Sequence, residues 1–208
     1  MVNPWLNIPA ADYEGHMGSP NVDQLSFLAS TFKETLEHHD CDTVALLGCA
    51  TGNGLEHVKR GFTRRVTAVD INPEYLGVLR QRYGNSVPGL EVVQDDLESC
   101  ELEKQAYSLI FAGLVFEYLE PQALLQRIAK WLQVNGILVA VLQMPAEGAS
   151  VTETPYTSLK SLNSIFNLID PKQFKIIAAD VGLMAIEEKF ITLETGKSFY
   201  IGTYQKST

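Results

Sequence analysis

The stretch Val44-Ala-Leu-Leu-Gly48-Cys-Ala-Thr-Gly52-Asn-Gly54 decides how this chain folds. Its apolar start is typical of a buried parallel strand, and its glycines allow a sharp turn that starts a helix against a ligand. The next apolar run ends at Asp70, where a carboxylate can accept hydrogen bonds from both hydroxyls of a ribose. Together the two segments predict the nucleoside-binding first half of an α/β sheet.

Strand-like and helix-like segments alternate on both sides of this stretch, which is the pattern of a doubly wound parallel sheet. The apolar spacing predicts a first helix over 22–38. The expected strands are 43–47, 65–69, 90–93, 108–112 and 137–142. The expected helices between them are 53–60, 73–83 and 121–132. The last two begin with proline, which is favoured in the first turn of a helix.

The composition changes after Gln143. A loop is followed by a helical region over 158–181, which Pro171 interrupts. Residues 185–193 and 198–204 then predict two strands joined by a short turn, so we expect a hairpin at the end of the chain.

Charge and composition narrow the classes of function. The chain has 208 residues, a formal net charge of −9 and 46% hydrophobic residues, which suits one domain and disfavours nucleic acid as a partner. Apolar stretches are strand-sized and the N-terminus lacks a signal-peptide pattern, so we expect no membrane span and a cytoplasmic location. Cys41, Cys49 and Cys100 form no C-x-x-C pair, so we expect reduced thiols and no metal site.

The glycine-rich loop resembles the acidic-x-G-x-G-x-G loop of class I S-adenosylmethionine (SAM) dependent methyltransferases. Its glycines do not follow the G-x-G-x-x-G register of dinucleotide-binding proteins. The segments 107–119 and 128–139 are similar to the fourth strand of this family and to the helix, turn and fifth strand that follow. The family also ends its sheet with a hairpin, and the resemblance covers residues 25–206.

The resemblance implies a Rossmann-like seven-stranded sheet, mostly parallel, with a reversed C-terminal hairpin strand. Residues 22–208 are expected to form the methyltransferase domain, and residues 1–21 an arm or lid over the active site. The implied reaction is in-line transfer of a methyl group from SAM to a small-molecule acceptor, which releases S-adenosylhomocysteine (SAH). No metal is implied, and the acceptor and the oligomeric state stay open.

Matched residue by residue, the resemblance places the cofactor at the ends of the first four strands. Asp70 falls on the ribose-binding acid, although it could instead cap the helix that begins near Asn72. Asp96 resembles the residue beside the adenine, with a solvated turn as the alternative, and Cys49 is expected to contribute its backbone amide rather than its thiol. The expected cofactor-binding residues are Gly48, Cys49, Ala50, Gly52, Asp70, Ile71, Asp96, Leu97 and Ala112.

Residues for catalysis and acceptor binding are expected near the carboxyl ends of the strands and in the N-terminal arm. Glu117 and Tyr118 follow the fourth strand and are candidates to face the methyl group, with a surface helix as the alternative. Tyr13 is a candidate acceptor contact, and the alternative for the arm is that its aromatic residues plug the edge of the core. His16 is the candidate general base and a further acceptor contact, because an imidazole titrates near neutral pH.

Three residues depart from the family pattern. Leu46 stands where the first strand usually carries an acid, Ala50 replaces the middle glycine, and Ser108 replaces an acid common at the start of the fourth strand. The missing acid at Leu46 favours a second hypothesis, a regulatory or interaction protein that binds SAM or SAH without catalysis. An NAD-linked oxidoreductase is a further alternative.

Overall fold

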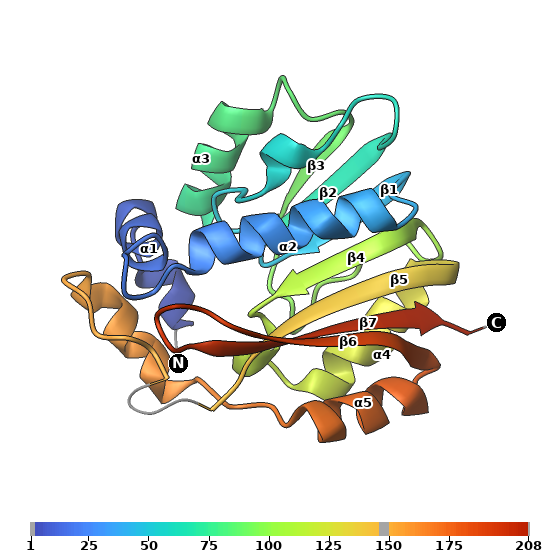
Figure 1. The fold of residues 1–208 in the computed structure, drawn as a ribbon. Helices are drawn as coiled ribbons and strands as arrows, with labels where there is room; N and C mark the ends of the chain where they lie inside the picture. Colours follow the sequence, from blue (N-terminus) through green and yellow to red (C-terminus); the bar gives the residue numbers. More distant parts are fainter. Residues whose placement is uncertain (1–2, 146–149, 208) are drawn as a thin grey trace.

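The computed structural model describes residues 3–145 and 150–207, and these form an α/β fold around one sheet of seven strands (Figure 1). The strand order is β3-β2-β1-β4-β5-β7-β6. β1 to β5 pair in parallel, whereas β7 lies antiparallel between β5 and β6. The expected sheet is therefore confirmed, including its reversed strand. The strands are β1 (Thr43–Leu47), β2 (Arg65–Asp70), β3 (Leu90–Gln94), β4 (Tyr107–Gly113), β5 (Leu132–Gln143), β6 (Leu183–Thr192) and β7 (Ser198–Lys206).

Helices cover both faces of the sheet. One core layer contains residues of α2 and α3 against one face, and the other contains residues of α4 and α5 against the opposite face. The short α1 lies in neither layer, because it packs with 3-10 turns beyond the strand ends. The α-helices are α1 (Ala10–Met17), α2 (Gln24–His38), α3 (Pro73–Tyr83), α4 (Pro121–Trp131) and α5 (Pro171–Asp180). The 3-10 helices are η1 (Pro4–Asn7), η2 (Leu55–His57), η3 (Phe116–Tyr118) and η4 (Thr157–Ser164).

The starts of three helices follow from their local sequence. α3, α4 and α5 each begin with proline, whose fixed φ suits the first helical turn. Asn72 caps α3, because its side-chain oxygen accepts hydrogen bonds from the backbone N–H groups of Glu74 and Tyr75. Asp170 caps α5 in the same way, through the N–H of Lys172.

The expected helix over 53–60 is wrong, and only the three-residue turn η2 forms there. Gly52 and Gly54 both have a φ of 90°, so the chain is left-handed where the helix should begin. Val58 is already extended, and few residues remain before the left-handed Gly61. A helix nucleus is costly and so short a segment adds few hydrogen bonds to offset it.

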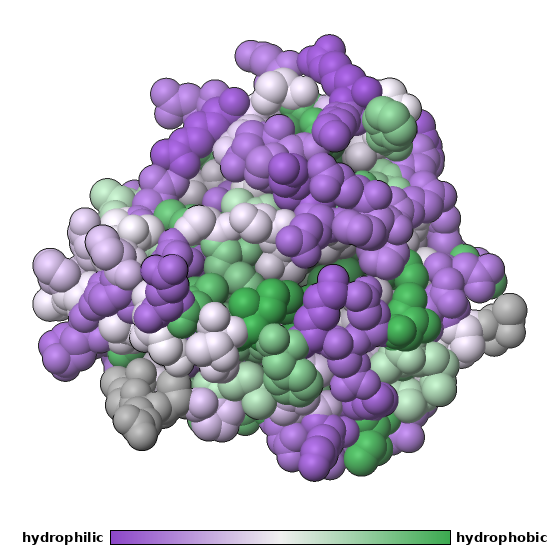
Figure 2. Space-filling view, viewed as in Figure 1, coloured by the Kyte–Doolittle hydropathy of each residue, from purple (hydrophilic) through white to green (hydrophobic). Residues whose placement is uncertain are grey.

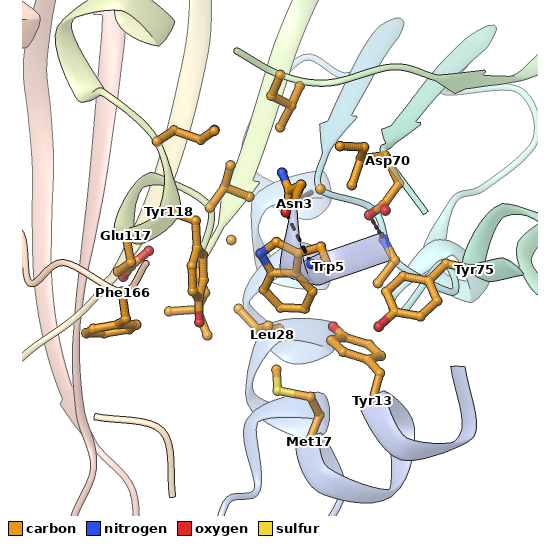
Figure 3. A pocket seen from close by; sticks show the side chains of 18 of the residues that line it. Asn3, Trp5, Tyr13, Met17, Leu28, Asp70, Tyr75, Glu117, Tyr118 and Phe166 are labelled. Carbon is orange, nitrogen blue, oxygen red and sulfur yellow. Dashed lines mark hydrogen bonds between the residues drawn. The ribbon is translucent and has the colours of Figure 1, made fainter. Parts of the chain in front are cut away.

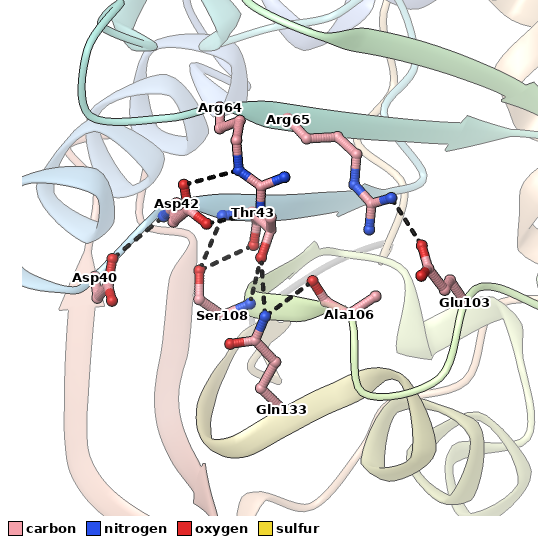
Figure 4. A network of polar contacts seen from close by, with 9 residues as sticks. All are labelled: Asp40, Asp42, Thr43, Arg64, Arg65, Glu103, Ala106, Ser108 and Gln133. Carbon is pink, nitrogen blue, oxygen red and sulfur yellow. Dashed lines mark hydrogen bonds and ion pairs between the residues drawn. The ribbon is translucent and has the colours of Figure 1, made fainter.

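The amino ends of β1 and β4 are joined by hydrogen bonds of Ser108, the residue that departs from the family pattern (Figure 4). Its Oγ accepts from the N–H of Thr43 at 3.1 Å and donates to the carbonyl of Thr43 at 3.0 Å. The Thr43 hydroxyl accepts from the N–H of Ser108 in return. A serine therefore stabilises this edge of the sheet, which lies opposite the candidate site.

The last hairpin places β6 at the edge of the sheet, with a turn at Gly196 where φ is 83°. Figure 2 shows apolar and charged side chains next to each other on the face where β6 runs. Met184, Ile186 and Phe190 are exposed along this strand, and charged residues on an edge strand oppose its pairing with other chains. No helix in the described part of the chain is long and apolar enough to cross a membrane.

Candidate functional site

A cavity of about 130 Å³ lies at the carboxyl ends of β1 to β5, beneath the N-terminal arm. The carboxyl ends of parallel strands meet at one edge of a sheet, so residues distant in the sequence converge there. Figure 3 shows Asp70 on one side of this cavity, Glu117 and Tyr118 on the other, and Trp5 between them. The residues that line it at the strand ends are Gly48, Ala50, Asp70, Ile71, Asp95, Asp96, Leu97, Gly113, Leu114, Val115 and Gln143.

The loop after β1 approaches the cavity through residues in left-handed backbone conformations. Gly48 has a φ of 61°, and a Cβ added there would lie 2.7 Å from Cγ2 of Val115. Ala50 has a φ of 44°, which costs an L-residue about 1–2 kcal/mol. The Ala50 N–H donates to Oδ2 of Asp70 at 2.8 Å, so this contact holds the loop in its strained form.

Asp70 ends β2 and presents its carboxylate to the cavity. Its Oδ1 accepts a hydrogen bond from the N–H of Asn72 at 2.9 Å, so it positions the start of α3 while Asn72 itself provides the cap. Burial raises the pKa of Asp70 to about 6, against the lowering effect of these backbone hydrogen bonds. Each carboxylate oxygen can accept more than one hydrogen bond, so both can also receive ligand hydroxyls.

The segment after β3 contributes a second acidic edge. Asp95, Asp96 and Leu97 line the cavity next to Ile71. Oδ1 of Asp96 accepts from the N–H of Glu98 at 2.9 Å, which fixes the turn. Asp96 can therefore both fix this turn and face a ligand, because its carboxylate can accept further hydrogen bonds.

The N-terminal arm covers the cavity and is attached to the start of α3. The Asn72 side-chain amide donates to the carbonyls of Trp5 at 2.9 Å and Ile8 at 3.1 Å. Trp5 contacts Tyr118 edge to face, with ring centroids 5.0 Å apart (Figure 3). Tyr13 also lines the cavity, and its ring lies 5.2 Å from that of Tyr75. The arm therefore contains two ordered helical segments, η1 and α1.

Glu117 lies in η3, at the other end of the cavity, and is fully buried. Its Oε1 accepts a hydrogen bond from the N–H of Gln143 at 2.6 Å. Its Oε2 is buried and has no hydrogen-bond partner among the described residues. Burial raises the pKa of Glu117 to about 7, and burial also raises the pKa of the neighbouring Tyr118. A carboxyl group that titrates near neutral pH can take up or release a proton during turnover.

Three of the predicted cofactor-binding residues do not line the cavity. The Cys49 N–H donates to the carbonyl of Val69, and burial raises the pKa of its thiol well above the usual value. Gly52 faces Tyr83 and Leu79. Ala112 is buried in the core, and the next residue, Gly113, lines the cavity instead of it.

His16 is also outside the cavity lining, on α1. Its Nδ1 lies 2.9 Å from the hydroxyl of Thr154. Burial, followed by the charge of Lys197, lowers the pKa of His16 to about 4, so the imidazole is neutral at physiological pH.

Sequence reasoning missed several residues that line the cavity. Tertiary packing decides which faces of α1 and α2 turn toward the cavity, and these faces contribute Met17, Gln24 and Leu28. Phe166 follows η4 in an irregular segment. Gln24 stands at the start of a predicted helix and at the border of its apolar face, so periodicity gave no clear signal for it. The residues missed are Asn3, Trp5, Met17, Gln24, Leu28, Tyr75, Asp95, Gly113, Leu114, Val115, Leu119, Gln143 and Phe166.

Comparisons with known proteins relate the chain to methyltransferases. A family model described as a methyltransferase domain matches residues 46–140. NodS, an N-methyltransferase from Bradyrhizobium japonicum solved with SAH, has a TM-score of 0.67 and 15% identity over 91% of this chain and 89% of that chain. A SAM-dependent methyltransferase from Mesorhizobium loti has a TM-score of 0.69 and 13% identity, over 88% of this chain and 100% of that chain.

The same fold also supports another reaction. The cyclase SpnF has a TM-score of 0.67 and 13% identity, over 88% of this chain and 81% of that chain. A search of curated protein sequences gives no match. At such low identities the solved structures establish the fold, and the reaction has to be argued from the site.

Proposed function

We propose that this chain, whose residues 46–140 are a methyltransferase domain in the class I SAM-dependent fold, binds SAM and transfers its methyl group to a small-molecule acceptor. The observation that carries this proposal is the Asp70 carboxylate beside the Gly48–Ala50 turn at one wall of the cavity. SAM supplies an activated methyl group on its sulfonium. The protein positions the acceptor and excludes water from the cavity.

The residues at the strand ends fit the parts of this cofactor. Asp70 would accept the two ribose hydroxyls, because its oxygens face the cavity and keep free acceptor sites. Asp96 and Leu97 would lie beside the adenine, and Ile71 would contact its face. Gly48 lines the cavity and has no side chain, so its backbone would approach the methionine part of the cofactor closely.

Isothermal titration calorimetry with SAH and with NAD tests this proposal. We expect SAH to bind and NAD to bind at least about a hundredfold more weakly, because the site offers one ribose acid and no dinucleotide glycine register. SAH at a hundred times its Kd should also stabilise the fold by about 2.7 kcal/mol. Binding of NAD in preference to SAH would overturn the proposal and favour an oxidoreductase.

The N-terminal arm, residues 1–21, is proposed to act as a lid that opens for the cofactor. The cavity beneath it, about 130 Å³, is smaller than the roughly 300–1,000 Å³ of ordinary ligand pockets. Trp5 occupies the centre of this space, and its contacts with Tyr118 are those of a packed aromatic pair. Cofactor entry therefore requires Trp5 to move away from Tyr118.

Tryptophan fluorescence can detect this movement because the chain has only two tryptophans. Trp131 is the last residue of α4 and is fully buried, and in a W131F variant Trp5 is the sole reporter. We expect SAH to change the intensity or wavelength of Trp5 emission in W131F, and to leave Trp131 emission unchanged in W5F. An SAH-saturated W131F protein with unaltered emission would contradict the lid.

A second candidate function is a SAM- or SAH-binding protein without transferase activity. The observation that favours it is Leu46, which is buried in the core of the sheet where the family usually places an acid. The charged group that commonly helps to order the loop and the methionine amine is therefore lacking at this position. SAH binding without methyl transfer to a broad panel of acceptors would support this candidate.

A further inference from the structure

Glu117 lines the cavity at the end opposite Asp70, and one of its buried carboxylate oxygens needs a hydrogen-bond donor. Oε2 of Glu117 has no partner among the described residues, although Oε1 is satisfied by Gln143. An unsatisfied buried carboxylate oxygen costs free energy unless a ligand supplies the donor. The sulfonium of SAM carries no N–H or O–H group, and its methionine ammonium group would lie beside Gly48 in the proposed binding mode. A donor group on the acceptor would therefore satisfy this oxygen.

The charges around the cavity favour a cationic donor. The described lining residues include four carboxylates and neither lysine nor arginine. An acceptor with a carboxylate or phosphate would therefore enter a cavity of like charge with no counterion. A neutral alcohol could donate a hydrogen bond to Glu117, but it would leave the buried charge uncompensated. The lining carboxylates are Asp70, Asp95, Asp96 and Glu117.

Aromatic rings next to Glu117 provide a further means of holding a cation. Tyr118 lies with its ring centroid 5.0 Å from that of Trp5 and 5.6 Å from that of Phe166. All three side chains line the cavity (Figure 3). The faces of such rings attract ammonium groups, and this attraction is strongest where water is excluded.

From these contacts we propose that the methyl acceptor is an amine, which enters as an ammonium ion and is bound by the Glu117 carboxylate among Trp5, Tyr118 and Phe166. This inference rests on the proposed methyltransferase function and names the substrate class of the same site. It assigns Glu117 two consecutive roles, as the counterion of the ammonium group and as the base that removes its proton.

The ammonium nitrogen gives one proton to Oε2 of Glu117 and thereby regains its lone pair. That lone pair forms the N–C bond to the methyl group while the C–S bond breaks and its electron pair stays on sulfur. The products are the N-methylated ammonium ion and SAH, and Glu117 then releases its proton to water. The pKa of Glu117, near 7, allows it both to accept and to release this proton.

Benzylamine, benzyl alcohol and benzoate form a matched probe set, because they share an aromatic body and differ in the polar group. Their binding should be measured by calorimetry with and without SAH, in the wild-type protein, in E117Q and in E120Q. Glu120 is the control, since it is exposed and lies three residues after Glu117. We expect benzylamine to bind the wild type and E120Q at least about tenfold more tightly than benzyl alcohol, and E117Q to remove this preference.

A second measurement keeps the test independent of how well E117Q folds. In the wild type, the preference for benzylamine should increase as the pH rises through about 7, where the Glu117 carboxylate forms. Mass spectrometry should find benzylamine heavier by one methyl group after incubation with SAM, with benzyl alcohol unchanged. Equal or tighter binding of benzyl alcohol or benzoate would overturn the amine inference, as would a preference that survives in E117Q. Failure of SAH to bind would instead count against the methyltransferase proposal.

Discussion

Replacing Asp70 by asparagine is expected to weaken SAH binding by about a hundredfold or more. Hydrogen bonds to a charged group contribute about 1.5–3 kcal/mol each, so loss of the charge beneath two ribose hydroxyls removes about 3 kcal/mol. In the wild type, the two carboxylate oxygens accept hydrogen bonds from the backbone N–H groups of Ala50 and Asn72. The asparagine side chain would turn its NH₂ group toward one of these N–H groups, which would then lose its acceptor. Calorimetry at neutral pH would measure the loss of affinity.

The pH dependence of binding provides an internal check on Asp70. Since burial raises the pKa of Asp70 to about 6, SAH affinity of the wild type should increase as the pH rises through that value, when the carboxylate forms. D70N should lack this increase. E91Q is a suitable control, because Glu91 is exposed on the neighbouring strand β3. Wild-type affinity in D70N would mean that the ribose lies elsewhere.

Replacing Glu117 by glutamine is expected to stabilise the fold above neutral pH. The pKa of Glu117 is raised by burial from 4.5 to about 7, so the folded state holds its proton more tightly than the unfolded state. The raised pKa therefore contributes to the free energy of unfolding of the wild type in full below about pH 4.5, and this stabilising contribution is lost as the pH rises through about 7. The difference corresponds to about 3 kcal/mol. Glutamine cannot ionise, and its oxygen can still accept from the N–H of Gln143.

Thermal unfolding of the wild type and of E117Q would measure this effect. The melting temperature of E117Q minus that of the wild type should increase by about 6–12 °C between about pH 4.5 and pH 8. E120Q should show a nearly constant difference from the wild type, because Glu120 is exposed. A constant difference for E117Q as well would show that the Glu117 carboxyl is solvated in solution.

The two variants are expected to differ in their effects on stability. D70N should lose SAH affinity together with some stability, because an amide N–H would face a backbone N–H group that the carboxylate accepts in the wild type. E117Q should become more stable above neutral pH while it loses the preference for benzylamine. A gain in stability together with a loss of ligand preference is typical of a residue kept for function.

Much of the sheet could be predicted because its signals are local. A buried parallel strand needs a continuous apolar run, and the run before Gly48 is unambiguous. Asp70 could be assigned to the site because it ends the next strand, and strand ends share one edge of the sheet. The reversed hairpin at the end of the chain was also predictable, since two strand-like runs flank a turn that contains Gly196.

Other features depended on contacts between segments far apart in the sequence. His16 has suitable chemistry for a base, but α1 turns it toward Thr154, which is 138 residues away, and away from the cavity. The expected helix after the glycine-rich loop is reduced to η2 by left-handed backbone at Gly52 and Gly54, where side chains of α3 and α2 pack closely. Neither outcome follows from periodicity, which describes one segment at a time.

The order of the strands, the reversed terminal hairpin and the acidic residue at the end of β2 could all be predicted from the sequence, because each depends on the apolar spacing and turn residues of a short segment. The position of Trp5 over the cavity became visible only in the folded chain, as did the buried Oε2 of the lining residue Glu117, which has no hydrogen-bond partner among the described residues. Burial and hydrogen-bond partners are properties of packed neighbours, and those of Glu117 come from β5 and from the segment after η4.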